Sequence, residues 1–273
     1  MEILITGGSG LLGEKLSEIA INKGYKVYAG YCHNIPKFGY PLKIDLTKEE
    51  DLKKIYQINP DIIIHTAALT NVDECEINKE LAYKINFEGT KKINKIAKKI
   101  NSFFIYISTD YVFPGEKGMY KEEDEPAPIN YYGYTKFLGE NYCDCVVRTC
   151  VVYGARQASG KVNFALWLIN KLENQEKIKI ITDQYITPTL NTNLAKMILE
   201  IAEKKLKGKF HLAGATRISR YDFALKIADK FKLNKNLIIP IKTDELNWIA
   251  KRPKDSSLDT SKASKILKEK PYK

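Results

Sequence analysis

The chain has 273 residues, of which 44% are hydrophobic and 28% charged, and a formal net charge of +11. This length and composition fit a globular α/β protein with room for an additional lobe, and no apolar segment approaches the roughly 18 residues that cross a bilayer. The N-terminus runs straight into a strand pattern with no signal peptide, so we expect a cytoplasmic location and no membrane partner.

The five cysteines are odd in number, and the three histidines lie far apart. We therefore expect buried thiols and no metal site. A disulfide is left open only for a hyperthermophilic source. The abundance of Lys, Ile and Glu is typical of a thermophile.

The first half of the chain alternates strand and helix patterns. Strands are expected at 2–6, 26–31, 42–44, 61–66, 103–108 and 145–148, and helices at 11–22, 48–58, 78–100 and 131–142. This repeated β-α-β order predicts an α/β fold with a Rossmann-like, doubly wound parallel sheet over residues 1–153.

After Gly154 the rhythm becomes irregular. Helices are expected at 162–172, 192–206 and 220–231, and strands at 177–181 and 209–212. No linker rich in Gly, Ser or Pro separates the halves. Residues 154–273 are therefore predicted to form mainly a smaller C-terminal lobe that is interleaved with the sheet.

The densest basic run, residues 91–100, is where the positive charge would most readily bind nucleic acid. Ile93, Ile96 and Ala97 recur there at helical spacing, so the lysines are predicted to form the solvated face of an amphipathic helix. No row of aromatic residues alternates with the basic ones. We expect no nucleic-acid partner, and a small anionic molecule as the species that the charge attracts.

A glycine-rich turn joins the first strand to the first helix. Gly7 allows the tight turn, Gly10 lets the backbone approach a diphosphate, and Gly13 allows the helix to pack closely on the sheet. The helix N-terminus then presents free N–H groups and a partial positive charge. Strand, turn and helix in this order predict dinucleotide binding rather than a tight turn without a ligand.

Tyr132 and Lys136 form a Tyr-x-x-x-Lys pair downstream of Thr109. Residues four apart share one helix face, and an ammonium beside a phenol favours the phenolate, so Lys136 is expected to lower the pKa of Tyr132. A tyrosine tuned in this way exchanges a proton with a carbonyl oxygen near neutral pH. Thr109 ends a strand at the edge of a parallel sheet where ligands bind.

The glycine spacing and the Tyr-x-x-x-Lys pair together resemble the extended short-chain dehydrogenase/reductases, over nearly the whole chain. The resemblance implies that Asp45 contacts the adenine, that Asn86 is the family's helix asparagine and that Lys136 holds the nicotinamide ribose. The implied cofactor-binding residues are Gly7, Ser9, Gly10, Leu11, Leu12, Gly13, Tyr31, His33, Asp45, Leu46, Ala67, Ala68, Leu69, Ile107, Tyr132 and Lys136.

The end of the second strand, residues 30–34, lacks the acidic residue that binds a ribose 2′-hydroxyl and selects NAD. A 2′-phosphate would meet no repulsion there, and His33 or Lys37 could approach it. We therefore expect NADPH as the cofactor, with NADH left open.

Within that superfamily, residues 108–115, 132–136, 183–189 and 252–253 resemble the dTDP-4-dehydrorhamnose reductases. By this resemblance Thr109 hydrogen-bonds the C4 carbonyl oxygen of a nucleotide-linked 4-keto-6-deoxy sugar, Tyr132 protonates that oxygen, and NADPH delivers a hydride to C4. The implied reaction converts dTDP-4-dehydrorhamnose to dTDP-rhamnose, with residues 154–273 as the substrate-binding lobe.

The implied substrate-binding residues are Thr109, Asp110, Tyr111, Val151, Asn163, Gln184 and Arg252. The planar fork of Arg252 suits a diphosphate, with an ordinary surface arginine as the alternative. For Asn163 and Gln184, a role in loop structure remains equally open.

Two departures from the bacterial reductases stand out. Val151 occupies the place of a substrate-contacting tryptophan, which leaves the hydride chemistry intact but the identity of the sugar open. Lys15 stands where an acid would support the metal-bridged dimer of some bacterial relatives, so a homodimer is left open and no metal is expected.

Three other functions share parts of this sequence pattern. A dehydratase is disfavoured because Tyr111 follows Asp110 where a second carboxylate is needed. A nucleotide-sugar epimerase shares the Tyr/Lys machinery and remains open. The regulatory β-subunit of methionine adenosyltransferase has a similar fold, an NADP site and similar segments at 120–128 and 209–212. That subunit has serine at the place of Thr109, which favours an enzyme.

Overall fold

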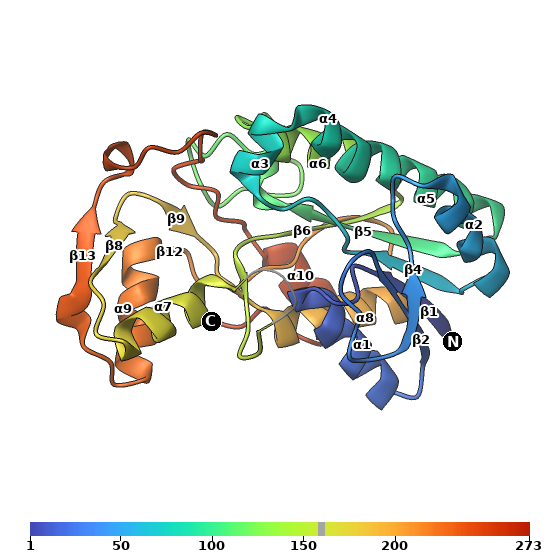
Figure 1. Cartoon of the computed structure of the whole chain (residues 1–273), viewed down its shortest axis with the longest axis horizontal. Helices are drawn as coiled ribbons and strands as arrows, with labels where there is room; N and C mark the ends of the chain where they lie inside the picture. The colour runs from blue at the N-terminus through green and yellow to red at the C-terminus, as the bar shows by residue number, and fades with distance from the viewer. Residues whose placement is uncertain (158–161) are drawn as a thin grey trace.

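Seven parallel strands form the central sheet of the computed structural model, which describes residues 1–157 and 162–273 (Figure 1). Their order is β11-β6-β5-β4-β1-β2-β3. The bounds are β1 Glu2–Thr6, β2 Lys26–Tyr31, β3 Tyr40–Lys43, β4 Ile62–His65, β5 Phe103–Thr109, β6 Cys145–Thr149 and β11 Gly208–His211. The predicted Rossmann-like class is confirmed, and the order reverses between β1 and β4, where such sheets bind ligands.

The central strands have continuous apolar segments because both faces of the sheet are covered. Ile3, Leu4 and Ile5 of β1 are fully buried, as are Ile62 to Ile64 of β4. Side chains alternate between faces, so continuous isoleucine and leucine supply the core on each side.

Helices cover the two faces as separate layers (Figure 1). On one face lie α1 (Leu11–Asn22), α8 (Asn191–Lys204) and α10 (Ser261–Ile266), which share a core with β1 and β4. On the other lie α2 (Glu49–Ile58), α5 (Thr90–Lys99) and α6 (Tyr131–Glu140), with α2 and α5 packed on a second core. Both layers leave the carboxyl ends of the strands accessible to ligands.

The long helix predicted at 78–100 is interrupted. It consists of α4 (Lys79–Ala82), the π-helical segment η1 (Tyr83–Gly89) and α5, and an unpredicted helix α3 (Val72–Ile77) precedes it. The wider π turn includes Asn86, which is fully buried. π turns within helices are frequent at functional sites.

The basic helix has the orientation that its spacing predicted. Ile93, Ile96 and Ala97 are buried, whereas Lys91, Lys95, Lys98 and Lys99 are exposed. The lysines of α5 therefore form a solvated face.

The smaller lobe combines two helices with short strand pairs (Figure 1). Its helices are α7 (Phe164–Glu173) and α9 (Arg220–Lys230). Its strand pairs are β8 (Ile178–Ile181) with β13 (Ile238–Ile241), β9 (Tyr185–Ile186) with β12 (Ile218–Ser219), and β7 (Val152–Tyr153) with β10 (Thr189–Leu190). The short 3-10 helices η2 (Asp110–Val112), η3 (Lys235–Leu237) and η4 (Thr243–Glu245) complete the elements.

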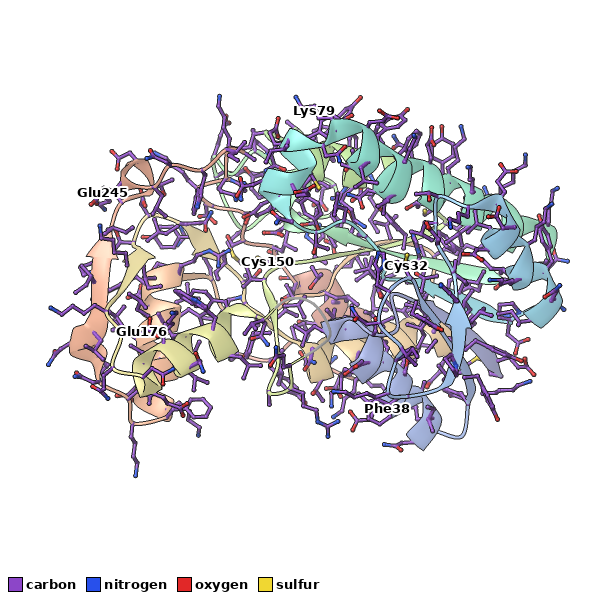
Figure 2. All side chains as sticks on the ribbon, in the orientation of Figure 1. Cys32, Phe38, Lys79, Cys150, Glu176 and Glu245 are labelled. Carbon is purple, nitrogen blue, oxygen red and sulfur yellow. The ribbon has the colours of Figure 1, made fainter. Side chains whose placement is uncertain are left out.

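The five cysteines are free thiols. Cys75, Cys145 and Cys150 are buried, and Cys150 lies where the sheet meets the lobe (Figure 2). The expectation of buried thiols is confirmed for these three. Across 1–157 and 162–273, no helix has both the length and the apolarity to cross a membrane.

Candidate active site

The glycine-rich turn has a geometry that fits a dinucleotide. Gly7 has a φ of +65°, and a Cβ added at Gly13 would lie 2.1 Å from the Gly7 carbonyl oxygen, so neither position tolerates a side chain. The N-cap of α1 is Gly10, without a side-chain hydrogen bond, which leaves the first N–H groups of the helix for a ligand. Ser9 lies in the turn, Leu11 is half-buried and Leu12 is buried beneath it.

Two hydrogen-bond networks order the loop after β4, where Ala67, Ala68 and Leu69 were predicted to line the cofactor. The Ala67 N–H donates to Thr6 Oγ1 (3.2 Å), and the Leu69 N–H donates to Asn86 Oδ1 (2.8 Å). Asn86 Nδ2 also donates to the Leu69 carbonyl (3.1 Å) and to Thr135 Oγ1 (3.2 Å) of α6. The π turn therefore joins this loop to the helix that carries Tyr132.

A buried histidine supports the same strand ends. His65 Nδ1 shares a hydrogen bond with Thr6 Oγ1 (2.7 Å), and its Nε2 shares one with Thr90 Oγ1 (3.1 Å). Burial lowers the pKa of His65 to about 3, so the ring is neutral at physiological pH. His65 therefore links β1 to α5 through hydrogen bonds without adding charge to the site.

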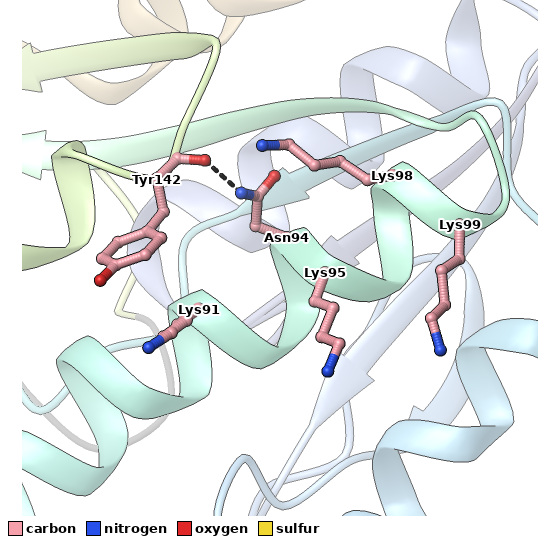
Figure 3. Close-up of a pocket in the computed structure, with 6 residues that line it drawn as sticks. All are labelled: Lys91, Asn94, Lys95, Lys98, Lys99 and Tyr142. Atoms are coloured by element: carbon pink, nitrogen blue, oxygen red, sulfur yellow. Dashed lines mark hydrogen bonds between the residues drawn. The ribbon is translucent and has the colours of Figure 1, made fainter.

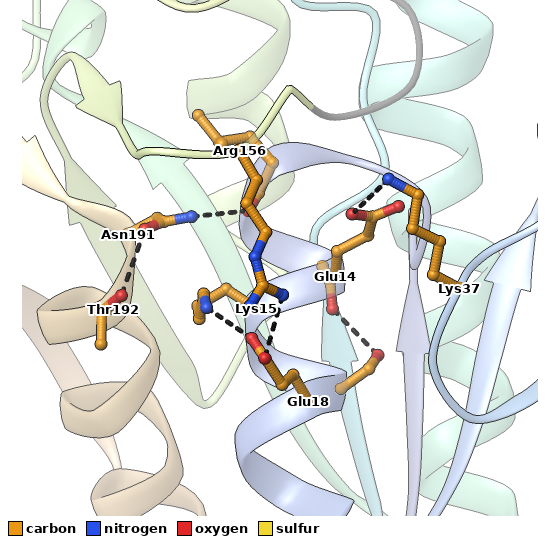
Figure 4. Close-up of polar contacts among 10 residues, drawn as sticks. Glu14, Lys15, Glu18, Lys37, Arg156, Asn191 and Thr192 are labelled. Carbon is orange, nitrogen blue, oxygen red and sulfur yellow. Dashed lines mark hydrogen bonds and ion pairs between the residues drawn. The ribbon is translucent and has the colours of Figure 1, made fainter. Parts of the chain in front are cut away.

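The end of β2 supplies the second predicted part of the cofactor site. Tyr31 is half-buried and His33 is exposed, while Lys37 lies 4.0 Å from Glu14 on α1 (Figure 4). Asp45 accepts hydrogen bonds from the N–H (2.9 Å) and hydroxyl (2.7 Å) of Thr47, and Leu46 beside it is buried. These groups follow β2 and β3, next to the glycine-rich turn in the sheet order.

Thr109, Tyr132 and Lys136 come together at the carboxyl end of β5. Tyr111, two residues after Thr109, packs its ring edge-on against that of Tyr132, with 6.1 Å between the ring centroids. The ammonium of Lys136 donates to the carbonyl of Ile107 (2.7 Å). Ile107, a predicted cofactor residue, is buried.

The predicted effect of Lys136 on Tyr132 is wrong for this structure. Burial raises the pKa of the Tyr132 phenol. Burial also lowers the pKa of Lys136 to about 7, so its ammonium carries less charge than the spacing implied. Tyr132 is consequently a protonated phenol, which is the form that donates a proton.

Asp110 is a buried carboxylate that holds Thr109 in place. Its Oδ1 accepts from Thr109 Oγ1 (3.0 Å), and its Oδ2 accepts from Cys150 Sγ (3.1 Å) and from the Ser256 hydroxyl. Burial raises the pKa of Asp110, against these hydrogen bonds. Cys150 and Ser256, which no sequence pattern had singled out, thus support the aspartate that binds Thr109.

Val151, between β6 and β7, has a strained backbone and packs against the core of the lobe. Its φ is +39°, in the left-handed region that a β-branched residue rarely adopts. Backbone strain of this kind costs about 1–3 kcal/mol and concentrates at functional sites. Val151 therefore holds the chain after β6 in an unusual conformation.

The remaining predicted substrate residues have structural partners. Asn163 caps α7 through the N–H groups of Ala165 (3.2 Å) and Leu166 (3.3 Å). Arg252 donates to Asp73 Oδ2 (2.9 Å) and to the Ala250 carbonyl (2.9 Å), so its fork is engaged with protein. Tyr111 lies beside Tyr132. Substrate contact by Tyr111, Asn163 and Arg252 stays a prediction.

Gln184 leads to an arginine that sequence reasoning missed. Gln184 is 2% exposed and donates to the Pro253 carbonyl (3.1 Å). Its side-chain oxygen accepts a hydrogen bond from Arg220 Nε at the start of α9. The positive charge of Arg220 acts on the carboxyl of Asp110 and the phenol of Tyr111, where it opposes the effect of burial on both pKa values. No motif marked Arg220, because its relation to the site depends on how the lobe folds back.

A hollow of about 410 Å³ lies away from these residues, on the solvated face of α5. Its lining consists of Lys91, Asn94, Lys95, Lys98, Lys99 and Tyr142 (Figure 3). None of Thr109, Tyr132 and Lys136 is among the residues that line it. The hollow therefore belongs to the lysine surface and not to the chemistry.

A Rossmann-like sheet, a glycine-rich turn at its switch point and a Thr/Tyr/Lys constellation at the end of β5 define a short-chain dehydrogenase/reductase. The family model described as RmlD substrate binding domain matches residues 1–273, and the chain belongs to this family. Membership confirms the resemblance to dTDP-4-dehydrorhamnose reductases and the expected class of NADP-dependent oxidoreductases.

Three relatives illustrate the range of proteins that the chain resembles. It is 34% identical to a probable low-salt glycan biosynthesis reductase, Agl14, of Haloferax volcanii, over 96% of this chain and 90% of that protein. It is 32% identical to a dTDP-4-dehydrorhamnose reductase of Aggregatibacter actinomycetemcomitans, over 95% and 91%. It is 33% identical to methionine adenosyltransferase 2 subunit beta of Bos taurus, over 95% and 80%.

Solved structures agree in fold over the whole chain. A hypothetical dTDP-4-dehydrorhamnose reductase from Sulfolobus tokodaii superposes with a TM-score of 0.90 at 42% identity, covering 100% of this chain and 97% of that one. A dTDP-4-dehydrorhamnose reductase from Bacillus anthracis, in complex with NADP, superposes with a TM-score of 0.88 at 32% identity, covering 99% and 95%.

Proposed function

We propose that the chain reduces the C4 carbonyl of a nucleotide-linked 4-keto-6-deoxy sugar with NADPH, and that the substrate is dTDP-4-dehydrorhamnose, the product dTDP-rhamnose. The observation that carries this proposal is that Thr109, at the end of β5, and Tyr132, beside the Tyr111 ring, lie at one site, where the buried Lys136 donates to the Ile107 carbonyl of β5. Two hydroxyls held together at the sheet edge are suited to one carbonyl oxygen.

In this mechanism the protein positions the carbonyl and supplies its proton. Bound NADPH would supply the hydride to C4. Tyr132 gives its phenolic proton to the C4 oxygen as negative charge develops there, and Thr109 hydrogen-bonds the same oxygen. Asp110 Oδ1 accepts the single hydroxyl proton of Thr109 (3.0 Å) in the structure, so this hydroxyl turns from Asp110 to the C4 oxygen when the sugar binds.

NADPH is preferred in this proposal because the β2 end offers no acidic side chain to a 2′-phosphate. His33 is exposed there, and Lys37 lies beside α1 at 4.0 Å from Glu14. Glu14 lies 4.0 Å from Lys37, and Asp45 and Asp51 are close enough to act on the Cys32 thiol, so the preference for NADPH rests on the lack of an acidic residue at positions 30–34. A lower KM for NADH than for NADPH would contradict this choice of cofactor.

The activity test uses NADPH absorbance at 340 nm with enzymatically prepared dTDP-4-keto-6-deoxy sugar. Tyr132→Phe is expected to lower kcat by about 10²- to 10⁴-fold, the usual contribution of a positioned proton donor. Tyr134→Phe is the matched control, because Tyr134 is on the same helix and 44% exposed. Absence of NADPH oxidation by the wild type, or full activity of Tyr132→Phe, would refute the proposal.

An NADP-binding regulatory subunit is the second candidate, favoured by the 33% identity to methionine adenosyltransferase 2 subunit beta. A regulatory subunit would bind NADP and a partner enzyme yet leave NADPH unconsumed with every 4-keto sugar offered. Epimerase activity is distinguished in the same assay, since an epimerase interconverts nucleotide sugars without net oxidation of NADPH.

A further inference from the structure

Three arginines surround the junction of the lobe and the sheet, and they differ in their partners. Arg217 forms an ion pair with Asp255 at 2.6 Å, and Arg252 forms one with Asp73 at 2.9 Å. Within 1–157 and 162–273, Arg220 has no carboxylate within ion-pair distance. A half-buried cation without a counter-charge is costly to the fold unless a ligand supplies the charge.

The guanidinium of Arg220 is held in a defined orientation. Its Nε donates to Gln184 Oε1, its backbone N–H donates to the Gln184 carbonyl (2.9 Å), and its Cζ lies 5.6 Å from the Phe164 ring centroid. Gln184 is itself fixed, because it is buried and bound to the Pro253 carbonyl. Because Nε donates to Gln184, the Nη1 and Nη2 groups of Arg220 remain to donate hydrogen bonds to a ligand.

The orientation also brings the charge toward the reacting groups. Gln184, which holds Arg220, donates to the Pro253 carbonyl (3.1 Å), and the hydroxyl of Ser256, three residues further on, donates to Asp110 next to Thr109. The unused edge therefore belongs to the same site as the proposed carbonyl chemistry, on the side formed by the lobe.

We propose that Arg220 binds the diphosphate of the nucleotide sugar through its Nη groups, whereas Arg252 fastens the 248–252 segment to α3. The proposal rests on the function proposed above and makes it more specific. A planar guanidinium forms paired, charge-assisted hydrogen bonds with phosphate oxygens, which a lysine does not reproduce.

The binding test is calorimetry on the full-length protein saturated with NADP⁺, with dTDP, UDP, GDP and thymidine as titrants. Arg220→Met is expected to weaken dTDP binding by about 10- to 100-fold, the loss that accompanies removal of hydrogen bonds to a charged group. Arg220→Lys is expected to recover only part of that loss. Binding of thymidine, which has no phosphate, should be the same in the wild type and both variants.

Two further variants make the result specific. Lys226→Met removes an exposed charge from the same helix and should leave dTDP affinity at the wild-type value. Arg252→Met tests the other arginine that was expected to bind the diphosphate. The proposal requires a larger loss of dTDP affinity in Arg220→Met than in Arg252→Met. Equal losses, an unchanged affinity in Arg220→Met, or no binding of any of the three diphosphates by the wild type would overturn the proposal.

The same experiment separates this proposal from the reductase proposal. Arg220-dependent dTDP binding without oxidation of NADPH would support the diphosphate site and refute the reduction. Oxidation of NADPH with the same KM for the sugar nucleotide in Arg220→Met and wild type would support the reduction and refute the role of Arg220.

Discussion

Burial decides the ionisation of the residues that carry the chemistry. Tyr132 keeps its proton because its phenol is removed from water, and the ammonium of Lys136 faces the Ile107 carbonyl and lies 4.2 Å from the Tyr106 ring centroid. A neutral phenol and a lysine with a pKa of about 7 are adjacent on one helix. The pair is therefore arranged to deliver a proton, with Lys136 easily converted between its two forms near neutral pH.

Lys136 makes the stability of the protein depend on pH in a predictable direction. Its pKa is about 7 when folded and near 10.4 when unfolded, so between these values the unfolded chain binds more protons and the free energy of unfolding rises with pH. Well below pH 7 Lys136 is protonated in the folded protein as well, so burial of the ammonium lowers the free energy of unfolding by its full amount. Lys136→Met lacks this cost at every pH.

We expect the stability of Lys136→Met relative to wild type to fall as pH increases from 7 to 10, by up to about 1.4 kcal/mol per pH unit. Urea unfolding of both proteins at intervals across this range measures the difference. A difference that stays constant across the range would mean that Lys136 is not buried as a titrating group.

At the scale of elements, α6 is positioned by a buried ion pair one turn beyond Lys136. Glu140 Oε2 accepts from Arg148 Nη2 (2.7 Å) on β6, and Glu140 Oε1 accepts from Ser108 Oγ (2.6 Å) on β5. Arg148 and Glu140 have no exposed side-chain area. The pair therefore fixes the catalytic helix on the two strands whose ends form the site.

Arg148→Met is expected to destabilise the protein by about 3–5 kcal/mol, because it leaves the Glu140 carboxylate buried without a counter-charge. The double variant Glu140→Gln with Arg148→Met should recover much of that loss. Denaturant unfolding at pH 7 gives both values.

Arg156→Met is the surface control for this prediction. It removes a 60% exposed arginine paired with Glu18 at 3.0 Å (Figure 4), and should cost less than about 1 kcal/mol. An Arg148→Met variant as stable as Arg156→Met would show that the buried pair does not hold α6.

At the scale of the whole molecule, the two halves of the chain share one core. β11 pairs with β6 at the sheet edge, and α8 packs with α1 in the core beneath β1 and β4. Asn191 Nδ2 also donates to the Leu11 carbonyl (3.1 Å), at the start of α1 (Figure 4). The lobe is therefore attached through elements of the sheet layer rather than through a linker.

A fragment of residues 1–153 is expected not to fold cooperatively, because it would expose the apolar faces that α8 and β11 cover. Loss of a cooperative thermal transition and poor dispersion of amide resonances would be the expected result, with the full chain as control. A fragment that melts cooperatively and binds NADP⁺ would support the domain division at residue 153, which otherwise stays a prediction.

Regular elements with a strong pattern were predicted closely. The bounds of β1, α1 and β2 agree with those expected, because glycines punctuate continuous apolar or helical patterns there. The π turn at 83–89 was missed since its residues are compatible with an ordinary helix. The two-residue strands of the lobe were missed because so short a segment has no periodicity.

The sequence by itself determined the doubly wound parallel sheet and the glycine-rich turn. It also predicted that Thr109, Tyr132 and Lys136 lie in one site. Each of these depends on local spacing and on the order of elements along the chain. Only the tertiary structure decided the raised pKa of Tyr132, the hydrogen bond from Ser256 to Asp110 and the lack of an ion pair at Arg220 among residues 1–157 and 162–273. Burial, and contacts between residues far apart in the chain, set these properties. Local spacing has no information about either, because both arise when the lobe packs against the sheet.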